Sequence, residues 1–521
     1  MNKHIYTALV IAAGLTITSC SDYLDVKPVG KLIPTEVSQF ENLLNNTNTL
    51  YYFQMDNNGG CSYAALGDNL EISENQLLYN FTATFPNLDI VAAYTFYEPI
   101  YTPTSTPMTW TYGYRAIGYF NNVIDGVSDI DNSSDYAKGI IAEARAARAW
   151  AYLTLALTYG PMYNPAGSND TKVIPLRTSG DPTVEEESLA TTQEIFDLVK
   201  EDLDYAVDNA PLTVGNPTRA SKVAALALRA EYYLYLRDWA NAQADAQRAW
   251  QLAVDAAGSA DELIYDFRDF YYEATTEINP EEGVSPEYYM TFRGPDNVFD
   301  QTGNRENLLW RDAPSSTSVN RYYPSEEWKA NFDQEHDLRW RLFGLTIPGY
   351  STTVGTTKHD DGVRTVYQRG AHLSTTESVT YPLLLIIKAE AEARNNNLSA
   401  ALNSLNTLRH YRYDYGEGAS TDLANGPSLS QDQLLTEILN ERRREQPLVS
   451  YQRTVDLKRY VYDSGKPWSK TTITHRSGDR TWTKNITDDY FQHLPIDNAI
   501  LEYNPQWGIE KETRIFDPTI K

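Results

Sequence analysis

Cysteine is nearly absent from this chain of 521 residues, which contains only Cys20 and Cys61. If Cys20 carries a lipid, as argued below, Cys61 is the single free thiol and no internal disulfide forms. An exported protein without disulfides must be stabilised by a large hydrophobic core, and about 500 residues can supply one. A lone cysteine of this kind is more often a small buried hydrophobe than a nucleophile.

Long apolar runs and positive charge are also scarce. The apolar run at 5–15 is too short to span a bilayer, and no other run approaches the ~18 residues that a spanning helix needs. The chain has 44 basic residues against 70 acidic ones, so its formal net charge is −26. Such a surface repels nucleic acids and anionic lipid headgroups, and we expect neither as a ligand.

Catalytic signatures are missing as well. The chain has no HExxH, no GxSxG and no glycine-rich phosphate loop, and its seven histidines are scattered. A glycosidase needs two carboxylates at a set separation, but with 70 acids a pair can always be picked, so picking one is uninformative. The acidic loop of Asp129, Asp131 and Asp135 lacks the glycine and final glutamate of an EF-hand and is more typical of a helix-capping loop. We therefore expect no enzyme activity, no metal and no cofactor.

The N-terminus reads as a lipoprotein signal. Lys3 and His4 precede the apolar run, and residues 17–20 read Ile-Thr-Ser-Cys, the pattern of a lipobox. This predicts a signal peptide at 1–19, cleavage before Cys20 and acylation of that residue. Each buried methylene of an acyl chain contributes about 0.8 kcal/mol, so several chains anchor a protein firmly. Residues 20–35 are polar and contain prolines, which is typical of a tether, and 36–521 are expected to form one domain.

The stretch 219–254 contains two apolar stripes with helical spacing. Val223, Leu226 and Ala230 lie on one face of the first, and a second stripe begins at Trp239 after a break at Arg237. Two such helices, lined by small residues and joined by a short turn, form the unit of a tetratricopeptide (TPR) repeat.

Other stretches repeat this helical spacing. Further pairs are expected at 136–159 with 191–209 and at 378–395 with 398–412, while 430–445 opens a fourth and single helices are expected at 36–50 and 110–127. One pair cannot bury its apolar stripe alone, so such pairs stack. We predict a mostly α fold with minor β, in which four TPR-like pairs, at about 136–254 and 378–460, support an irregular, loop-rich face.

Two long insertions, at about 51–110 and 258–377, are rich in glycine, proline, asparagine and aromatic residues. Irregular segments of this length are uncommon unless they are functional, so we expect them to form the ligand-binding face. Residues 460–521 are also irregular and include a predicted β-hairpin around Gly478. The Glu-Arg-Arg-Arg-Glu run at 441–445 has the i, i+3 and i, i+4 spacing of ion pairs on a helix surface.

Aromatic residues beside hydrogen-bonding residues suggest carbohydrate recognition, because sugar rings stack on aromatic faces while their hydroxyls need polar partners. Tryptophans 150, 239 and 250 lie on predicted helices and are interpreted as core. The second insertion offers the candidate ligand residues Trp310, Tyr322, Tyr323, Arg305 and Asn307. The alternative for each aromatic is a buried side chain on a loop.

Several short motifs occur in a recognisable order along the chain. They are the lipobox followed by Tyr23-Leu24-Asp25, Trp110 with Tyr114, Ile117, Asn121 and Ile124, Glu143-Ala144-Arg145, Arg219-Ala220-Ser221-Lys222, Ala389-Glu390-Ala391 with Leu405-Asn406 and Arg409, the run at 441–445, and Leu494-Pro495-Ile496. In this order and spacing the chain resembles the SusD/RagB family of nutrient-binding outer-membrane lipoproteins. It departs from the family pattern after residue 445, where an Arg-aromatic-aromatic-Asp-Leu string is replaced by residues 453–457, and at Asp497, where a proline is usual.

The resemblance implies the fold predicted above and a partner, a SusC-like TonB-dependent outer-membrane transporter. It also implies ligand contacts in the second insertion, near Trp110 and in the early loop at Asp68 and Asn69. The expected function is capture of an oligosaccharide or polysaccharide at the surface of a Gram-negative cell, with Cys20 as the lipid anchor. The alternatives are a peptide-binding RagB-like protein, a lipid-anchored glycoside hydrolase and a pure assembly scaffold.

Overall fold

The computed structural model describes residues 34–46, 62–84, 88–98, 107–181, 183–184, 188–295, 297–312, 322–374 and 376–514. The predicted signal peptide, Cys20, most of the tether and Cys61 lie outside these residues. In the part described, helices predominate and the strands form two-stranded sheets, which confirms the mostly α fold with minor β.

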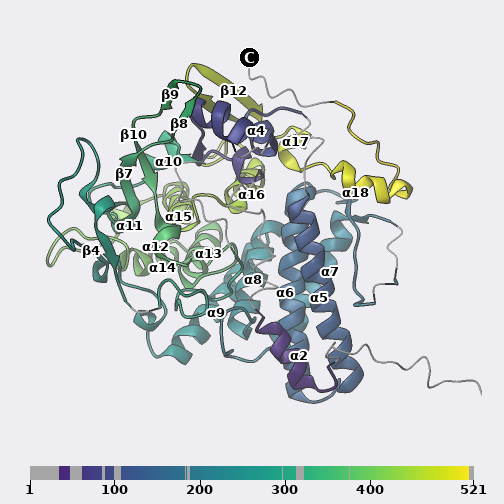
Figure 1. The fold of residues 1–521 in the computed structure, drawn as a ribbon. Helices are drawn as coiled ribbons and strands as arrows, with labels where there is room; N and C mark the ends of the chain where they lie inside the picture. Colours follow the sequence, from purple (N-terminus) through teal and green to yellow (C-terminus); the bar gives the residue numbers. More distant parts are fainter. Residues whose placement is uncertain are drawn as a thin grey trace, which may run out of the picture.

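A layer of long helices forms one side of the molecule (Figure 1). Its helices are α2 (Val37–Leu44), α5 (Met108–Ile130), α6 (Asp135–Tyr159) and α7 (Thr192–Asn209), with the short α4 (Leu88–Tyr94) packed elsewhere, near β11. The alanine-rich α6 is buried along most of its length between α5 and α7, because small side chains let its neighbours approach closely. Thr191 accepts a hydrogen bond from the N–H of Glu194, and its own N–H donates to the Glu194 carboxylate at 2.7 Å, so a capping box begins α7.

A second group of helices continues the scaffold. It comprises α8 (Lys222–Leu236), α9 (Trp239–Ala257), α13 (Tyr381–Arg394), α14 (Leu398–His410), α15 (Gln431–Glu445) and α16 (Tyr451–Tyr460). Arg237 adopts a left-handed conformation and makes the tight turn between α8 and α9. These helices lie within a few residues of the predicted stretches, whereas their TPR-like superhelical arrangement stays a prediction.

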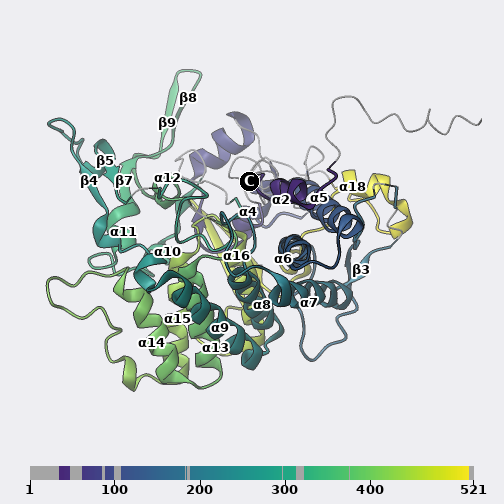
Figure 2. The same cartoon turned by 90° about the horizontal axis from the view of Figure 1, so that it is seen from below.

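The strands and short helices lie mainly in the insertions and near the C-terminus. The antiparallel pairs are β1 (Leu70–Glu71) with β6 (Tyr323–Pro324), β2 (Lys172–Ile174) with β3 (Ala190–Thr191), β4 (Tyr271–Glu273) with β5 (Thr291–Arg293), β7 (Gly344–Pro348) with β10 (Val363–Tyr367), β8 (Ser351–Val354) with β9 (Thr357–Asp360), and β11 (Thr472–Ser477) with β12 (Arg480–Asn485). The short helices are α10 (Glu326–Lys329), α11 (Leu338–Phe343), α12 (Arg369–His372), α17 (Asp489–Gln492) and α18 (Asn498–Tyr503). The hairpin β11–β12 turns at Gly478 as predicted, and the β8–β9 hairpin projects from the body in Figure 2.

The charged run at the end of α15 is buried, so its interpretation as a set of surface ion pairs was wrong. The Arg339 guanidinium lies 2.6 Å from a carboxylate oxygen of Glu441 and 2.7 Å from one of Glu445. Arg412 contacts Glu445 at 2.8 Å and Glu306 at 2.8 Å. Acidic residues and arginines at helical spacing give the same sequence pattern on a protein surface and in its interior. Here the second insertion, which includes α11, and the end of α14 cover the charged run.

The same network extends to the helices on the other side of α15. Arg442 contacts Asp456 at 2.9 Å, and Arg459 contacts both Asp456 at 2.7 Å and Glu390 at 2.6 Å. Each of these side chains is almost completely buried. The ion pairs therefore join α13, α15 and α16 inside the core.

Trp310 lies in the hydrophobic core, and the expectation that it forms an open platform for a sugar is wrong. Its side chain is 1% exposed, and its backbone N–H donates to the carbonyl of Pro217 at 2.7 Å. Tyr322 and Tyr323 are buried as well, and the Tyr323 hydroxyl donates to Asp361 at 2.8 Å. The physical reason is that the second insertion folds back onto the helices, so Trp310 and Tyr322 join the main core, while Tyr323 packs in a small separate cluster.

We predict that Glu445→Gln lowers the free energy of unfolding by about 3–5 kcal/mol at neutral pH, because it leaves buried arginines without their anion. Burial raises the pKa of Glu445, but the charges of Arg412, Arg369 and Arg339 lower it by a larger amount. The pKa of Glu445 is therefore well below its usual 4.5. A carboxyl group whose pKa is lowered by folding stabilises the folded state at pH values above its ordinary pKa. This stabilisation is lost as the pH falls toward the lowered pKa of the folded state. The deficit measured by urea unfolding should therefore shrink below about pH 4. The control Glu326→Gln, on an exposed side chain, should change stability by less than about 0.5 kcal/mol; an equal loss in both variants would contradict the prediction.

We also expect Trp310→Ala to destabilise the protein by about 3–5 kcal/mol, as truncation of a buried tryptophan does. Thermal melts of the variant, compared with Phe299→Ala at a site that is 57% exposed, measure the difference. An unchanged melting temperature for Trp310→Ala would show that the ring is not part of the core.

Candidate functional site

Two pockets of the described structure contain residues that the sequence singled out. We call the first the Trp110 cleft, after the residue at the start of α5 that lines it, and the second the Asp68 pocket. They differ in size and chemistry, and this difference decides which is the better candidate for a ligand.

The Trp110 cleft has a volume of about 1170 Å³ and is open to solvent. It lies between the N-terminal half of α5, the segments 175–181 and 183–184, and the end of α18 with the residues that follow it. Figure 1 shows α18 beside the N-terminal end of α5. Its lining residues are Trp110, Tyr114, Arg115, Gly118, Tyr119, Asn122, Pro175, Arg177, Gly180, Val184, Tyr503, Asn504, Gln506 and Trp507.

Hydrogen bonds from the helices fix the wall opposite α5. The Tyr114 hydroxyl donates to the carbonyl of Pro175 at 2.7 Å, and the buried Asn121 amide donates to that of Arg177 at 2.9 Å. The Arg177 N–H donates to the Tyr152 hydroxyl at 2.6 Å. The motif residues Tyr114 and Asn121 therefore position a loop rather than a ligand, and the cleft is held open by a rigid frame.

Aromatic rings line the cleft at different depths. Trp110 is nearly buried, and its ring lies 5.0 Å from that of Tyr114, 5.2 Å from that of Tyr159 and 6.1 Å from that of Trp507. Trp507 is half-buried, and Tyr503 is 84% exposed. Trp110 thus supports the wall, while Trp507 and Tyr503 present the faces that a ligand can reach.

The floor of the cleft has room and hydrogen-bonding groups. A Cβ added at Gly118 would meet no atom within 4 Å, so this position on α5 faces open space. Arg115 and Asn122 are exposed on the same side of α5, since they lie three and four residues from Gly118. Among the described lining residues, the donors include guanidinium, amide and tyrosine hydroxyl groups, and no carboxylate is present.

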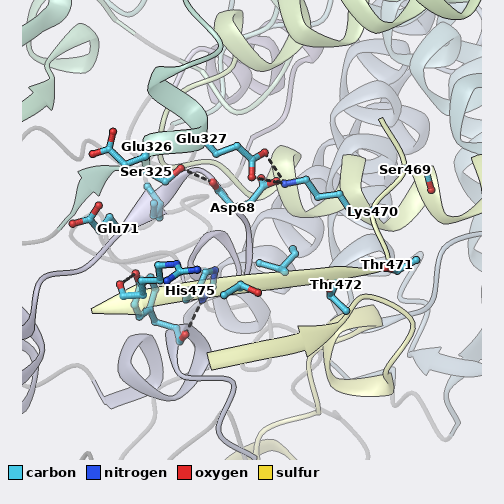
Figure 3. Close-up of a pocket in the computed structure, with 15 residues that line it drawn as sticks. Asp68, Glu71, Ser325, Glu326, Glu327, Ser469, Lys470, Thr471, Thr472 and His475 are labelled. Atoms are coloured by element: carbon cyan, nitrogen blue, oxygen red, sulfur yellow. Dashed lines mark hydrogen bonds and ion pairs between the residues drawn. The ribbon is translucent and has the colours of Figure 1, made fainter. Parts of the chain in front are cut away.

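The Asp68 pocket is smaller, about 640 Å³, and lies between β11, β1 and the start of α10 (Figure 3). Asp68 accepts hydrogen bonds from Arg453 at 2.7 Å and from Lys470 at 2.5 Å, and Lys470 also contacts Glu327 at 2.6 Å. Burial raises the pKa of Asp68, but Arg443, Arg453 and Lys470 overcome this effect and hold it well below its usual range. The carboxylate is therefore ionised and already occupied by protein cations.

His475 forms another wall of the Asp68 pocket. Its ring is stacked between those of Tyr94 at 4.4 Å and Phe96 at 4.5 Å, and its two nitrogens lie 2.7 and 2.8 Å from the carbonyl oxygens of Tyr94 and Gly67. Burial lowers the pKa of His475, and the carbonyl contacts oppose that shift. Because Tyr94 is buried, this pocket offers no open aromatic face among the residues described, and we assign its charged groups a structural role.

The remaining candidates line neither pocket. The side-chain amide oxygen of Asn69 accepts a hydrogen bond from the Arg443 guanidinium at 2.8 Å inside the protein. Arg305 lies over the Tyr265 ring at 4.1 Å, and Asn307 donates to the carbonyl of Gln301 at 3.1 Å. Of the eight predicted ligand residues, the structure thus places Trp110 in the cleft and Asp68 in the other pocket, and the eight do not form one site.

Sequence reasoning missed Tyr503, Trp507, Arg115 and Arg177. The aromatic residues near the C-terminus were a weak signal, because nothing in their local pattern shows that they pack against α5. The contact between Trp110 and Trp507 joins residues about 400 positions apart in the chain.

The described residues contain neither a cluster of metal-binding side chains nor a helix able to cross a membrane. No group of three or more His, Cys, Asp or Glu side chains there could hold a metal ion. The Asp131 carboxylate instead accepts hydrogen bonds from the N–H groups of Ser133 and Ser134, and Ser134 caps α6. No helix in the same residues is long and apolar enough to cross a membrane.

Comparison with known families gives two matches. The SusD-like family model described as "Starch-binding associating with outer membrane" matches residues 22–234, and the SusD family model matches residues 383–509. Together they span about two thirds of the chain. A search of curated proteins found no match.

Solved structures resemble this one over nearly its whole length. A SusD superfamily protein from Bacteroides fragilis is 18% identical, with a TM-score of 0.62 over 92% of this chain and 100% of its own. A SusD superfamily protein from Bacteroides thetaiotaomicron is 16% identical, with a TM-score of 0.60 over 90% and 98%. A SusD-like carbohydrate binding protein from Bacteroides vulgatus is 17% identical, with a TM-score of 0.56 over 91% and 97%. At these identities the likeness establishes the fold, and with the two family matches it leads to one conclusion: the chain belongs to the SusD/RagB family.

Proposed function

We propose that this protein captures an oligosaccharide in the Trp110 cleft without altering it chemically. The observation that carries the proposal is the composition of the cleft, in which accessible Tyr503 and Trp507 lie beside guanidinium and amide groups. Sugar rings pack their C–H faces on such aromatic surfaces, while the polar groups bond their hydroxyls. The family description as starch-binding supports the same class of ligand.

The composition of the cleft also favours a binding protein over the rival hydrolase. A retaining glycosidase needs two carboxyl groups about 5–5.5 Å apart, and an inverting one needs them about 6.5–9.5 Å apart. No carboxylate belongs to the described lining of the Trp110 cleft. A non-enzymatic role therefore accounts for these residues better than hydrolysis does.

We further infer that Cys20 is lipidated and that the protein delivers its ligand to a SusC-like TonB-dependent transporter in the outer membrane. The lipobox at 17–20 supports the anchor, and membership of the family supports the partner. Both inferences concern features outside the described residues or outside this chain.

Gly118→Leu should abolish tight oligosaccharide binding without weakening the fold. Leucine replaces glycine in a helix, which is favourable by up to about 1 kcal/mol, and its side chain would extend into the open cleft. We expect an unchanged or higher melting temperature and at least a tenfold loss of affinity in calorimetric titration against the best binder from a glycan array. Trp507→Ala should also weaken binding about tenfold, since a stacked ring contributes on the order of 1 kcal/mol or more.

The matched control is Gly118→Ala, which adds one methyl group and should alter affinity little. Full affinity in both Gly118→Leu and Trp507→Ala, with intact melts, would remove the cleft from the proposal.

Changing Cys20 to Ala tests the anchor. Without the thiol no acyl chain can attach, so the variant should leave the detergent-soluble membrane fraction and appear in the aqueous phase. Phase partitioning of cell extracts measures this, and an unchanged distribution would contradict lipidation at Cys20.

A further inference from the structure

One wall of the Trp110 cleft is a loop without regular secondary structure. Residues 175–181 follow β2, and Pro175, Arg177 and Gly180 of this loop line the cleft. The backbone groups of such a loop need partners from other parts of the protein. The partners that they find determine how far the loop lies from α5, and therefore how wide the cleft is.

The carbonyl groups of the loop are bonded to a buried side chain of α5. The Asn121 amide nitrogen donates to the carbonyl of Arg177 at 2.9 Å and to that of Ser179 at 3.3 Å. One amide nitrogen carries two N–H groups, so it can make both bonds. Asn121 is completely buried, and water does not compete for these bonds. The inner side of the loop is therefore anchored inside the layer of long helices.

A single arginine fixes the orientation of Asn121. The Arg148 guanidinium on α6 donates to the side-chain oxygen of Asn121 at 2.8 Å. Because a guanidinium can only donate, the Asn121 oxygen must face it, and the amide nitrogen is left for the loop. Arg148 also makes two bonds to the carboxylate of Asp202 on α7, at 2.8 and 2.7 Å, and both side chains are buried. We call Asp202, Arg148 and Asn121 the Arg148 network; it runs through three helices that lie side by side in Figure 1.

The outer side of the loop packs directly on α5. The N–H of Gly180 donates to the carboxylate of Asp125 at 2.7 Å, one turn after Asn121. A Cβ at residue 180 would lie 2.9 Å from the backbone nitrogen and Cα of Asn122, so this close approach requires glycine. Loop and helix are thus joined at two points, one in the interior and one near the surface.

We propose that the Arg148 network and Asp125 are positioning residues that set the width of the Trp110 cleft. The inference rests on the proposed function and assigns part of the recognition to side chains that do not touch the ligand. None of these four residues belongs to the lining of the cleft. They act through the backbone of the loop, because a wall that is ordered in advance loses little entropy when a ligand binds, whereas a loosened wall must first be ordered.

A purely structural role is the alternative, since the Arg148–Asp202 pair also joins helices of the scaffold. The chain offers a matched pair for comparison, Arg229 on α8 with Asp245 on α9. The Arg229 guanidinium makes two bonds to Asp245, at 2.7 and 2.9 Å, and neither residue lines the cleft. A structural role predicts the same consequences for both pairs, whereas a positioning role predicts an effect on the loop and on binding for the Arg148 network alone.

The first experiment removes the outer contact. Asp125→Ala should accelerate hydrogen exchange of the Gly180 amide about tenfold or more, because that N–H loses its acceptor. The affinity for the best binder from a glycan array, measured by calorimetric titration, should fall about threefold or more. Asp125→Asn keeps an acceptor oxygen in the same place and should restore most of both values. Thermal melts of all variants verify that they are folded.

The second experiment removes the inner anchor without leaving a buried charge. Arg148→Met/Asp202→Leu replaces both ions by apolar side chains, an exchange that often preserves the stability of a fold. Asn121 then lacks the donor that orients it, so exchange of the amides in residues 175–181 should accelerate and affinity should fall about tenfold. The control Arg229→Met/Asp245→Leu should change neither the exchange of these amides nor the affinity.

Unchanged affinity in both Asp125→Ala and Arg148→Met/Asp202→Leu overturns the positioning role, even if the loop exchanges faster. An equal loss of affinity in the Arg229 and Asp245 control also overturns it, because the effect would then follow from the scaffold. If Arg148→Met/Asp202→Leu does not fold, Asp125→Ala decides alone, since Asp125 is only half-buried. Absence of binding by the unaltered protein is a different result, which overturns the proposed function and the positioning role with it.

Discussion

The fold depends on neutralising the charges at the end of α15 inside the protein. Removing an ion from water costs several kcal/mol, and only a complete set of close partners offsets that cost. The partners of Glu441 and Glu445 come from separate parts of the chain, Arg339 from the second insertion and Arg412 from the turn just after α14. The insertion therefore cannot separate from the helices without leaving buried charges unpaired, and this explains why Trp310 is part of the core rather than of a mobile ligand-binding loop.

The same constraint decides between the two pockets. Arg443, in the middle of the charged run, contacts Asp68 and Glu327, so the Asp68 pocket is an extension of the ion network to the surface. Its carboxylates and cations already satisfy one another. The Trp110 cleft lies on α5, away from the network, and its polar groups are not needed to balance the charges of α15. A binding site can change its residues there without disturbing the pairs on which the fold depends.

Local patterns predicted the helices well, because apolar spacing and capping residues act within a few turns. The capping box at Thr191 and the turn at Gly478 are examples of such local chemistry. Burial depth could not be predicted in the same way: acid and arginine at helical spacing look alike on a surface and in a core, and Trp310 has the same neighbours in sequence whether it faces solvent or helices. The contact between Trp507 and Trp110 could not be predicted from local sequence either, since it depends on where the C-terminal segment packs.

The structure thus assigns rigidity and recognition to different residues. Trp110 and Tyr114 are held by neighbouring rings and by a bond to the loop at 175–184, so the walls of the cleft are formed before a ligand arrives. Side chains that are already ordered lose little entropy on binding, and this favours affinity from a small number of contacts. Tyr503, which is largely exposed, is the part of the cleft that retains freedom. In the proposed function the walls would determine which ligand fits, whereas the exposed ring would adjust to a bound sugar.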